Sequence, residues 1–261
     1  MGFRQSGLIK YYCYDELPSR ELVHGIFTRR GGVSPAPWDS LNLGGMSGDD
    51  KVNVIENRKR IFNAVGLPVE SIYDAWQVHG TDVICTDKPR PLEMAHLRAD
   101  AILTNTPGVT LFQRFADCVP IFLYDPVHRV IGMVHAGWNG TVQRLARISV
   151  KVMEEKYNSV PEDIQAVIGP SIGPDHYQIG LDVEKKVIDS FGLASEDLLL
   201  HKDRKMFLNL WQANLYSLRD AGVKNIYITG ICTACHLEDW YSHRGEHGNT
   251  GRFGALIALV G

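Results

Sequence analysis

The stretch LFQRFADCVPIFLYDPVHRVIGMVHAGWNG, Leu111–Gly140, decides the fold that we expect for this chain. It holds two runs rich in β-branched and aromatic residues, Val119–Tyr124 and Val130–Val134, which are typical of strands. The Asp-Pro pair at 125–126 supplies a turn between these runs. The stretch therefore predicts a β-hairpin.

Cys118 and His135 stand at the outer ends of the predicted hairpin, so strand pairing would bring their side chains together. A third side chain of this kind is His79 in AWQVHGTDV, where Gly80 lets the backbone turn sharply. Two imidazoles and one thiolate suit zinc, whose catalytic sites keep three protein ligands and one open position. Packed or hydrogen-bonded side chains are the alternative, because free cysteines are usually buried and the three positions match no short zinc motif.

Composition is that of an ordinary globular protein and argues against several functions. The 261 residues are 44% hydrophobic and 22% charged, which allows a sizeable core and does not indicate disorder. The net charge of −3 lacks the basic footprint of a nucleic-acid binder. No apolar run is long enough to cross a membrane, and Met1–Lys10 lacks the apolar centre of a signal peptide. We expect one domain over residues 1–261, located in the cytoplasm, with no nucleic-acid or membrane partner.

The cysteines number five, an odd count that does not indicate a disulfide framework in a chain without a secretion signal. They are Cys13, Cys85, Cys118, Cys232 and Cys235. Reduced thiols or metal ligands are therefore favoured. The Cys-x-x-Cys at 232–235 has no second such pair and no thioredoxin-like setting, so its role stays open.

Helix signals alternate with strand signals along the rest of the chain. Asp49–Asp50 predicts the cap of a helix over 52–67, and Thr141 predicts the cap of a second helix, Val142–Lys156. Further helices are expected at Leu181–Phe191 and Leu210–Ala221, and further strands at Val23–Thr28, Ile72–Val78, Thr81–Thr86, Ala99–Thr104, Val109–Phe115, Ile164–Ile168, Ile226–Thr229 and Phe253–Val260. This alternation predicts an α/β (mixed α+β) fold, a layered sandwich of mixed, largely antiparallel sheets with flanking helices.

Several short motifs together resemble one protein family. The most informative are QVHG at Gln77–Gly80, ADCVP at Ala116–Pro120 and HAGW-x-G at His135–Gly140. The others are FTRRGGVS at Phe27–Ser34, SLNLG at Ser40–Gly44, IGPSIG at Ile168–Gly173, YSHR at Tyr241–Arg244 and TGR at Thr250–Arg252. As an ordered set over nearly the whole chain, they resemble the YfiH-type family. This family was formerly labelled multicopper polyphenol oxidase or laccase-domain and is now associated with purine nucleoside phosphorylase activity.

The resemblance implies a zinc-dependent enzyme of purine nucleoside metabolism. It implies phosphorolysis of adenosine, inosine and methylthioadenosine to the free base and ribose 1-phosphate or its methylthio analogue, with phosphate as co-substrate. Deamination of adenosine is implied as a second activity. His79, Cys118 and His135 fall at the family's metal-ligand positions, where zinc is expected and copper is an alternative.

Other residues in these motifs are candidates for catalysis or substrate contacts. Asp117 precedes Cys118 and is expected to orient a ligand histidine or to act as an acid or base. The candidates for substrate or phosphate binding are Arg29, Asn42, Gln77, Arg244 and Arg252. Guanidinium groups bind phosphate through two hydrogen bonds, although a structural role is the alternative for each arginine. The chain departs from the family at Asn139, where many members have arginine, and it lacks a cysteine that members often carry near His176.

The same residues bear on three alternative functions. A true laccase needs several His-x-His pairs, and the ten histidines of this chain form none. A metal-free hydrolase or deamidase would use Cys118 as the nucleophile and His135 as its base. A non-catalytic module with a structural zinc would need a fourth protein ligand, for which Cys85 or His243 is the candidate. The oligomeric state is left open.

Overall fold

The predicted hairpin forms the centre of the structure. In the computed structural model, which describes residues 2–261, strand β8 (Val119–Asp125) pairs antiparallel with β9 (Val130–Ala136). The Asp125 carboxylate accepts hydrogen bonds from two backbone amides of the turn, at 2.8 and 3.2 Å. The hairpin prediction is therefore confirmed.

Two six-stranded sheets are built around this hairpin and a second central strand, β15. One sheet has the order β1 (Gly2–Ser6), β2 (Ile9–Cys13), β3 (Leu22–Phe27), β15 (Phe253–Leu259), β7 (Thr110–Phe115), β4 (Ile72–Asp74). The other has the order β14 (Asn225–Ile228), β10 (Gln165–Ile168), β8, β9, β6 (Ala101–Thr104), β5 (Val83–Cys85). Among the described strands, neighbours in these sheets are antiparallel except in the pairs β4–β7, β5–β6 and β10–β14. The expected mixed, largely antiparallel sheets are confirmed.

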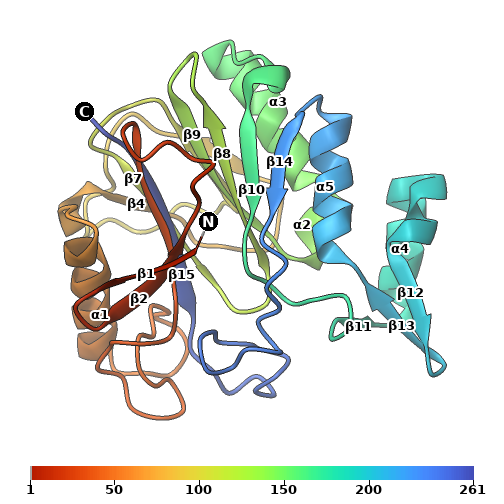
Figure 1. The fold of residues 1–261 in the computed structure, drawn as a ribbon, viewed down its shortest axis with the longest axis horizontal. Helices are drawn as coiled ribbons and strands as arrows, with labels where there is room; N and C mark the ends of the chain where they lie inside the picture. Colours follow the sequence, from red (N-terminus) through yellow and green to blue (C-terminus); the bar gives the residue numbers. More distant parts are fainter. Residues whose placement is uncertain (1) are drawn as a thin grey trace.

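The two sheets share an apolar core, and helices cover their outer faces (Figure 1). Side chains of β8 alternate between the two faces of its sheet. Phe122 and Tyr124 join the core between the sheets, whereas Ile121 and Leu123 pack toward the helices. Every residue of β8 and β9 is buried for this reason. Continuous apolar strands of this kind are typical of a sheet covered on both faces.

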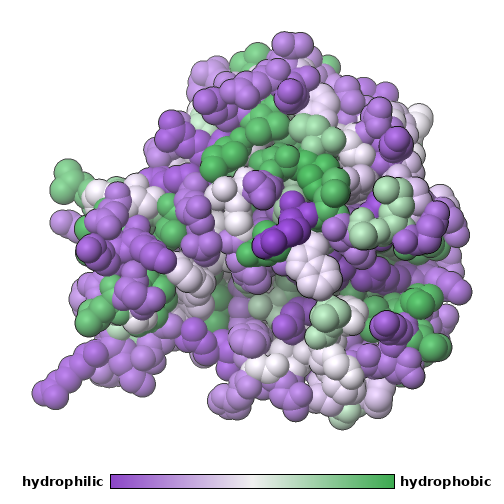
Figure 2. Space-filling view, turned by 180° about the vertical axis from the view of Figure 1, so that it is seen from behind, coloured by the Kyte–Doolittle hydropathy of each residue, from purple (hydrophilic) through white to green (hydrophobic). Residues whose placement is uncertain are grey.

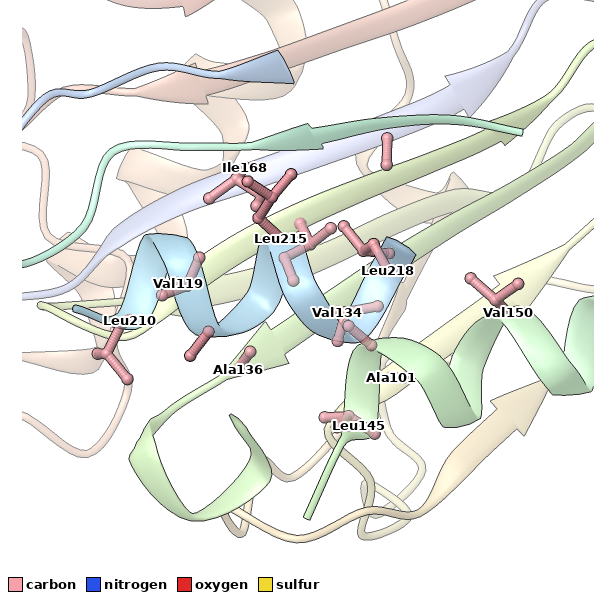
Figure 3. Packing of buried hydrophobic residues seen from close by; sticks show 14 of the residues in the cluster. Ala101, Val119, Val134, Ala136, Leu145, Val150, Ile168, Leu210, Leu215 and Leu218 are labelled. Carbon is pink, nitrogen blue, oxygen red and sulfur yellow. The ribbon is translucent and has the colours of Figure 1, made fainter. Parts of the chain in front are cut away.

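Helices α3 (Leu145–Tyr157) and α5 (Leu210–Asp220) lie on the sheet that contains the hairpin. Figure 3 shows Leu215 and Leu218 of α5 directed at the strands, beside Val150 of α3. Helix α1 (Lys51–Ala64) covers the other sheet, and α4 (Leu181–Phe191) with the three-stranded sheet projects beside α5 (Figure 1). The remaining elements are α2 (Trp138–Val142), β11 (Gln178–Ile179), β12 (Leu199–Lys202), β13 (Lys205–Leu208), and the 3-10 helices η1 (Val69–Ser71), η2 (Pro161–Asp163) and η3 (Gly192–Asp197).

The predicted cap at Thr141 is wrong. Thr141 lies inside α2, and its hydroxyl accepts a hydrogen bond from the Asn214 side chain at 3.0 Å. Arg144, with a left-handed backbone (φ 62°), separates α2 from α3, so the long helix begins at Leu145. Gly137 therefore precedes a short helix, and Gly140 lies within it.

The other local predictions are confirmed with shifted ends. The carboxylate of Asp50 caps α1 by accepting a hydrogen bond from the Val52 amide at 2.9 Å, and the helix ends at Ala64. The strands expected over 72–78 and 81–86 shorten to β4 and β5, because the backbone between them turns around a buried carboxylate described below.

Figure 2 shows the face behind the view of Figure 1, where hydrophobic residues gather near the middle of a mostly hydrophilic surface. Among the described helices, none has the length and apolar character needed to cross a bilayer.

Candidate functional site

A cavity of about 570 Å³ opens at the outer end of the β8–β9 hairpin. Pockets of this size hold small molecules. Its lining combines metal-binding, cationic and aromatic side chains from segments far apart in the sequence. The lining residues are Gly44, Gly45, Met46, Ser47, Trp76, Gln77, His79, Arg114, Ala116, Asp117, Cys118, His135, Trp138, Ile172, Tyr177, Leu210, His243, Arg244 and Arg252.

His79, Cys118 and His135 lie together in the wall of this cavity, with one potential ligand atom from each within 4.8 Å of the others. Cys118 immediately precedes β8 and His135 lies in β9, where the register sets it opposite Pro120. His79 comes from the turn between β4 and β5. Two imidazole nitrogens and a thiolate fit zinc, and three protein ligands leave one coordination position open.

Asp100, which the sequence did not point to, holds the His135 side chain and the backbone around His79 in place. Its carboxylate contacts His135 Nδ1 at 2.8 Å and accepts hydrogen bonds from the backbone amides of Val78, His79 and Gly80 at 2.7 to 3.1 Å. Burial opposes ionisation of Asp100, but His135 and these amides lower its pKa below the ordinary value. A carboxylate on Nδ1 fixes the tautomer and leaves Nε2 as the metal-binding atom.

The same carboxylate explains an unusual backbone at His79. His79, rather than the glycine after it, carries the left-handed conformation (φ 59°), which costs a non-glycine residue about 1 kcal/mol or more. The three amide hydrogen bonds to Asp100 offset this strain. The Asn139 side chain adds a hydrogen bond to the carbonyl of His79 at 2.7 Å.

Gly137 permits the close approach of the cluster to the backbone after β9. A β-carbon at this position would lie 3.0 Å from His79 Cδ2 and 3.1 Å from Cys118 Sγ. Any larger residue would therefore push against two of the three candidate ligands.

Electrostatic coupling within the cluster favours charged forms. Burial opposes ionisation of the Cys118 thiol, but the adjacent His135 and His79 outweigh it and lower the pKa to about 6. Burial likewise opposes protonation of His135, but the Cys118 thiolate and Asp100 raise its pKa to about 9. At neutral pH the metal-free pair is therefore a thiolate and an imidazolium, and the thiolate is the form that binds a metal.

Two of the predicted arginines line the cavity and keep donors available. Arg252 Nη1 donates to the carbonyls of Thr250 and Gly251, while its Nε and Nη2 bond to no residue in the described part of the chain. Arg244 Nη1 donates to the carbonyl of Gln178 at 3.0 Å, and its guanidinium lies 5.2 Å from the Tyr177 ring centroid. Both can offer guanidinium hydrogen bonds to a ligand.

Arg29 and Asn42, both predicted to bind substrate or phosphate, are not among the residues that line the cavity. The Arg29 guanidinium pairs with Glu246 at 2.9 Å and lies over the Tyr241 ring. Asn42 is fully buried, where its side chain bonds to Ser47 Oγ at 2.8 Å and to the Arg252 amide at 2.9 Å. Both residues support the loops around the cavity instead.

Gln77 lines the cavity together with Arg114, which the sequence did not point to. Gln77 Nε2 donates to the Arg114 carbonyl at 2.8 Å, and its Oε1 accepts from the Arg114 amide at 3.0 Å. The guanidinium of Arg114 is tied to the buried Asp74 carboxylate (3.3 Å) and to the Ala75 carbonyl (2.6 Å). The pair therefore stiffens one wall of the cavity, and substrate binding by Gln77 stays a prediction.

The carboxylate that contacts a candidate ligand histidine in the structure is Asp100 rather than Asp117. The Asp117 carboxylate accepts hydrogen bonds from Thr233 Oγ1 (2.7 Å), Ser242 Oγ (2.6 Å) and the Arg244 amide (2.6 Å). These bonds join two loops behind the cavity. A role as acid or base stays a prediction, since Asp117 does line the cavity.

The fourth ligand required by a structural zinc is not found among the proposed residues. Cys85 and His243 are both absent from the cluster of His79, Cys118 and His135 as the described residues define it. His243 lines the cavity, and Cys85 is an exposed residue of β5.

Comparison with known proteins adds sequence and structural relatives. A family profile described as "Multi-copper polyphenol oxidoreductase laccase" matches residues 23–260. The chain is 38% identical to "Purine nucleoside phosphorylase" of Deinococcus radiodurans, over 93% of this chain and 91% of the relative. It is 37% identical to "Purine nucleoside phosphorylase YlmD" of Bacillus subtilis, over 97% and 94% of the two chains.

The fold matches a crystal structure of YlmD from Geobacillus stearothermophilus with a TM-score of 0.93. The superposition covers 99% of each chain at 32% sequence identity.

Proposed function

Because the chain belongs to the YfiH-type family of laccase-domain proteins, we propose that it is a zinc-dependent purine nucleoside phosphorylase. The resemblance carried by the sequence motifs is confirmed by the match over residues 23–260 and by relatives named YlmD. The proposed substrates are adenosine, inosine and methylthioadenosine, each split by phosphate into the free base and ribose 1-phosphate or its methylthio analogue.

One observation carries the proposal: three candidate zinc ligands lie in the wall of a nucleoside-sized cavity that two arginines with free donors also line. Phosphorolysis needs an anion held beside the ribose and a base held against a surface. Arg244 and Arg252 supply guanidinium groups for phosphate. Trp76, Trp138 and Tyr177 supply aromatic faces for the purine.

The chain's own residues prepare this site. Asp100 keeps His135 Nδ1 hydrogen-bonded and so directs Nε2 toward Cys118. Tyr177 and Ile172 line the same cavity as the two arginines. His79, Cys118 and His135 would hold a zinc ion, which would supply a Lewis acid at the cavity wall.

Adenosine deamination is proposed as a second activity of the same site. The open coordination position and the cavity are the features that support it. Deamination would convert adenosine to inosine without phosphate, so the product distinguishes it from phosphorolysis.

The laccase description of the family profile is not carried into the proposal. The ten histidines form no His-x-His pair, so the sequence lacks the ligand pattern of a trinuclear copper cluster. A metal-free Cys-His hydrolase is a second candidate, which the thiolate–imidazolium pair of Cys118 and His135 favours.

The test is turnover of adenosine and inosine by zinc-loaded protein, with and without phosphate, followed through adenine, hypoxanthine and ribose 1-phosphate. Base release that requires phosphate and disappears in Cys118→Ala, but not in the exposed control Cys85→Ser, is expected. Full zinc loading without turnover of either nucleoside would refute the proposal. Esterase or amidase activity that survives a chelator would favour the hydrolase.

A further inference from the structure

A second cluster of metal-binding side chains lies apart from the three candidate ligands. It consists of Asp175, His176, Cys232 and Cys235, whose potential ligand atoms all lie within 4.8 Å of one another. Sequence separates the Asp-His pair from the Cys-x-x-Cys pair by more than fifty residues. The fold, not local sequence, brings these four side chains together.

Parallel pairing of β10 with β14 accounts for the meeting of the two segments. The carboxyl ends of parallel strands lie at the same edge of a sheet, so the chain continues from both strands side by side. The contact extends beyond the strands through a bridge between Ser171 and Cys232. The Ser171 amide donates to the Ile231 carbonyl at 3.2 Å, and the Thr233 amide donates to the Ser171 carbonyl at 3.1 Å.

The separations in this cluster match tetrahedral zinc coordination. Zinc bonds of about 2.3 Å to sulfur and about 2.0 Å to nitrogen or oxygen, at tetrahedral angles, place sulfur about 3.6 Å from either atom. His176 Nδ1 lies 3.7 Å from Cys232 Sγ and 3.5 Å from Cys235 Sγ. Cys235 Sγ lies 3.8 Å from Asp175 Oδ2. His176 Nδ1 lies 3.0 Å from Asp175 Oδ2, which is only slightly shorter than such a geometry requires.

The local backbone is shaped for this close approach. A β-carbon on Gly173 would lie 2.6 Å from Asp175 Oδ1 and 3.1 Å from Cys232 Sγ, so a side chain at this position would intrude between the two segments. The Gly173 amide donates a hydrogen bond to Cys232 Sγ at 3.1 Å. An amide donor of this kind stabilises a thiolate ligand.

We propose that Asp175, His176, Cys232 and Cys235 bind a structural zinc ion. Two thiolates, an imidazole and a carboxylate form a complete four-ligand set, which closes the coordination sphere as structural zinc sites do. Cys232 is buried, whereas Asp175, His176 and Cys235 are exposed, so the ion can reach the site from solvent.

The consequence for the cavity follows from the neighbours of the cluster. Tyr177, next to His176 in the chain, lines the cavity, and Thr233 inside the Cys-x-x-Cys segment bonds to Asp117 in the cavity wall. Zinc would therefore fix the wall that carries Tyr177 and Arg244 without touching the substrate.

Zinc counting on the whole protein tests this proposal independently of enzyme activity. Protein purified with reductant, loaded with zinc and freed of excess metal is measured by inductively coupled plasma mass spectrometry. Two zinc ions per chain are expected in the wild type and in Cys85→Ser. One ion is expected in Cys118→Ala, and one in either Cys235→Ser or His176→Gln, whose altered side chains are exposed.

Cobalt substitution in the Cys118→Ala background supplies a second readout. We expect intense cobalt absorption that includes thiolate-to-cobalt charge transfer. This absorption should be lost in the double variants that also carry His176→Gln or Cys235→Ser, provided that these variants fold. The proposal is overturned if Cys118→Ala binds no zinc. It is also overturned if both exposed-residue variants keep two ions, or if Cys232 and Cys235 form a disulfide that zinc loading leaves intact under reductant.

Discussion

The structure holds two clusters of metal-binding side chains, one in the cavity wall and one behind it, and they differ in how completely they could surround an ion. His79, Cys118 and His135 offer three ligands and face the cavity, whereas Asp175, His176, Cys232 and Cys235 offer four and lie behind its wall. Three ligands leave a position for chemistry, and four leave none.

The two clusters also differ in the parts of the structure that hold their side chains in place. The three-ligand cluster depends on Asp100, which contacts His135 and offsets the left-handed backbone of His79. The four-ligand cluster depends on two chain segments that run side by side after a pair of parallel strands. The three-ligand cluster therefore relies on a carboxylate that is not itself a ligand. In the four-ligand cluster, a bound ion can hold the ligands together.

Replacing Asp100 is expected to have the largest effect and to act on one cluster only. Asp100→Asn weakens the contact to His135 Nδ1 and removes acceptor capacity for the three amides, so zinc affinity at the three-ligand cluster should fall about 10- to 100-fold. Competition with a chromophoric chelator measures this affinity. Asp82→Asn, an exposed carboxylate nearby, is the matched control. An equal loss at both clusters would contradict the difference that we describe.

Thiol reactivity should separate the clusters in metal-free, reduced protein. The pKa of Cys118 is lowered to about 6, so its thiolate is present above this pH and is lost as the pH falls through it. Burial and the neighbouring Cys232 and Asp175 raise the pKa of Cys235, which stays a thiol at neutral pH. At pH 7.5 iodoacetamide should modify Cys118 at least about tenfold faster than Cys235, although Cys235 is more exposed.

Peptide mapping by mass spectrometry gives both rates, with the exposed Cys85 as an internal reference. Faster modification of Cys235 than of Cys118 at this pH would contradict the assigned charges.

Replacing the Arg252 guanidinium with an ammonium group should raise KM for phosphate more than KM for the nucleoside. Arg252→Lys keeps the charge but loses bidentate geometry, so KM for phosphate should rise about tenfold, with a smaller change in KM for inosine. Initial rates with either substrate varied measure this difference. Arg147→Lys, on the exposed face of α3, is the control. An unchanged KM for phosphate would remove Arg252 from the binding set.

Replacing Asn139 should have the smallest effect on zinc affinity. Asn139→Ala removes one hydrogen bond to the His79 carbonyl, worth about 1 kcal/mol, so zinc affinity of the three-ligand cluster should fall only about fivefold. The same chelator competition detects it. A loss as large as that of Asp100→Asn would mean that the His79 turn depends on Asn139 more than on the buried carboxylate.

Local sequence features predicted the hairpin and the ends of several helices. The β-branched runs on either side of Asp125 and the cap at Asp50 depend on neighbouring residues, and both are confirmed. The Thr141 cap failed because Arg144 adopts a left-handed backbone between two helices, which no side-chain pattern indicated.

Site residues were predictable only where a motif carried them. His79, Cys118 and His135 lie in family-like motifs, whereas Asp100 is an acidic residue before a strand with no distinctive spacing. In the sequence, Asp100 stands out only as an acidic residue next to apolar residues. Both Asp100 and these neighbours are buried in the structure. The partners of Cys232 and Cys235 could not be read from the chain, because they follow from the parallel pairing of β10 with β14.

Anomalous diffraction at the zinc edge, from crystals grown with zinc and phosphate, tests the contrast between the two clusters most directly. The expected map has one peak bound by His79, Cys118 and His135 plus a non-protein ligand in the cavity. A second peak should be bound by Asp175, His176, Cys232 and Cys235 alone. A fourth protein ligand at the first peak, or no ion there at full zinc loading, would contradict the account.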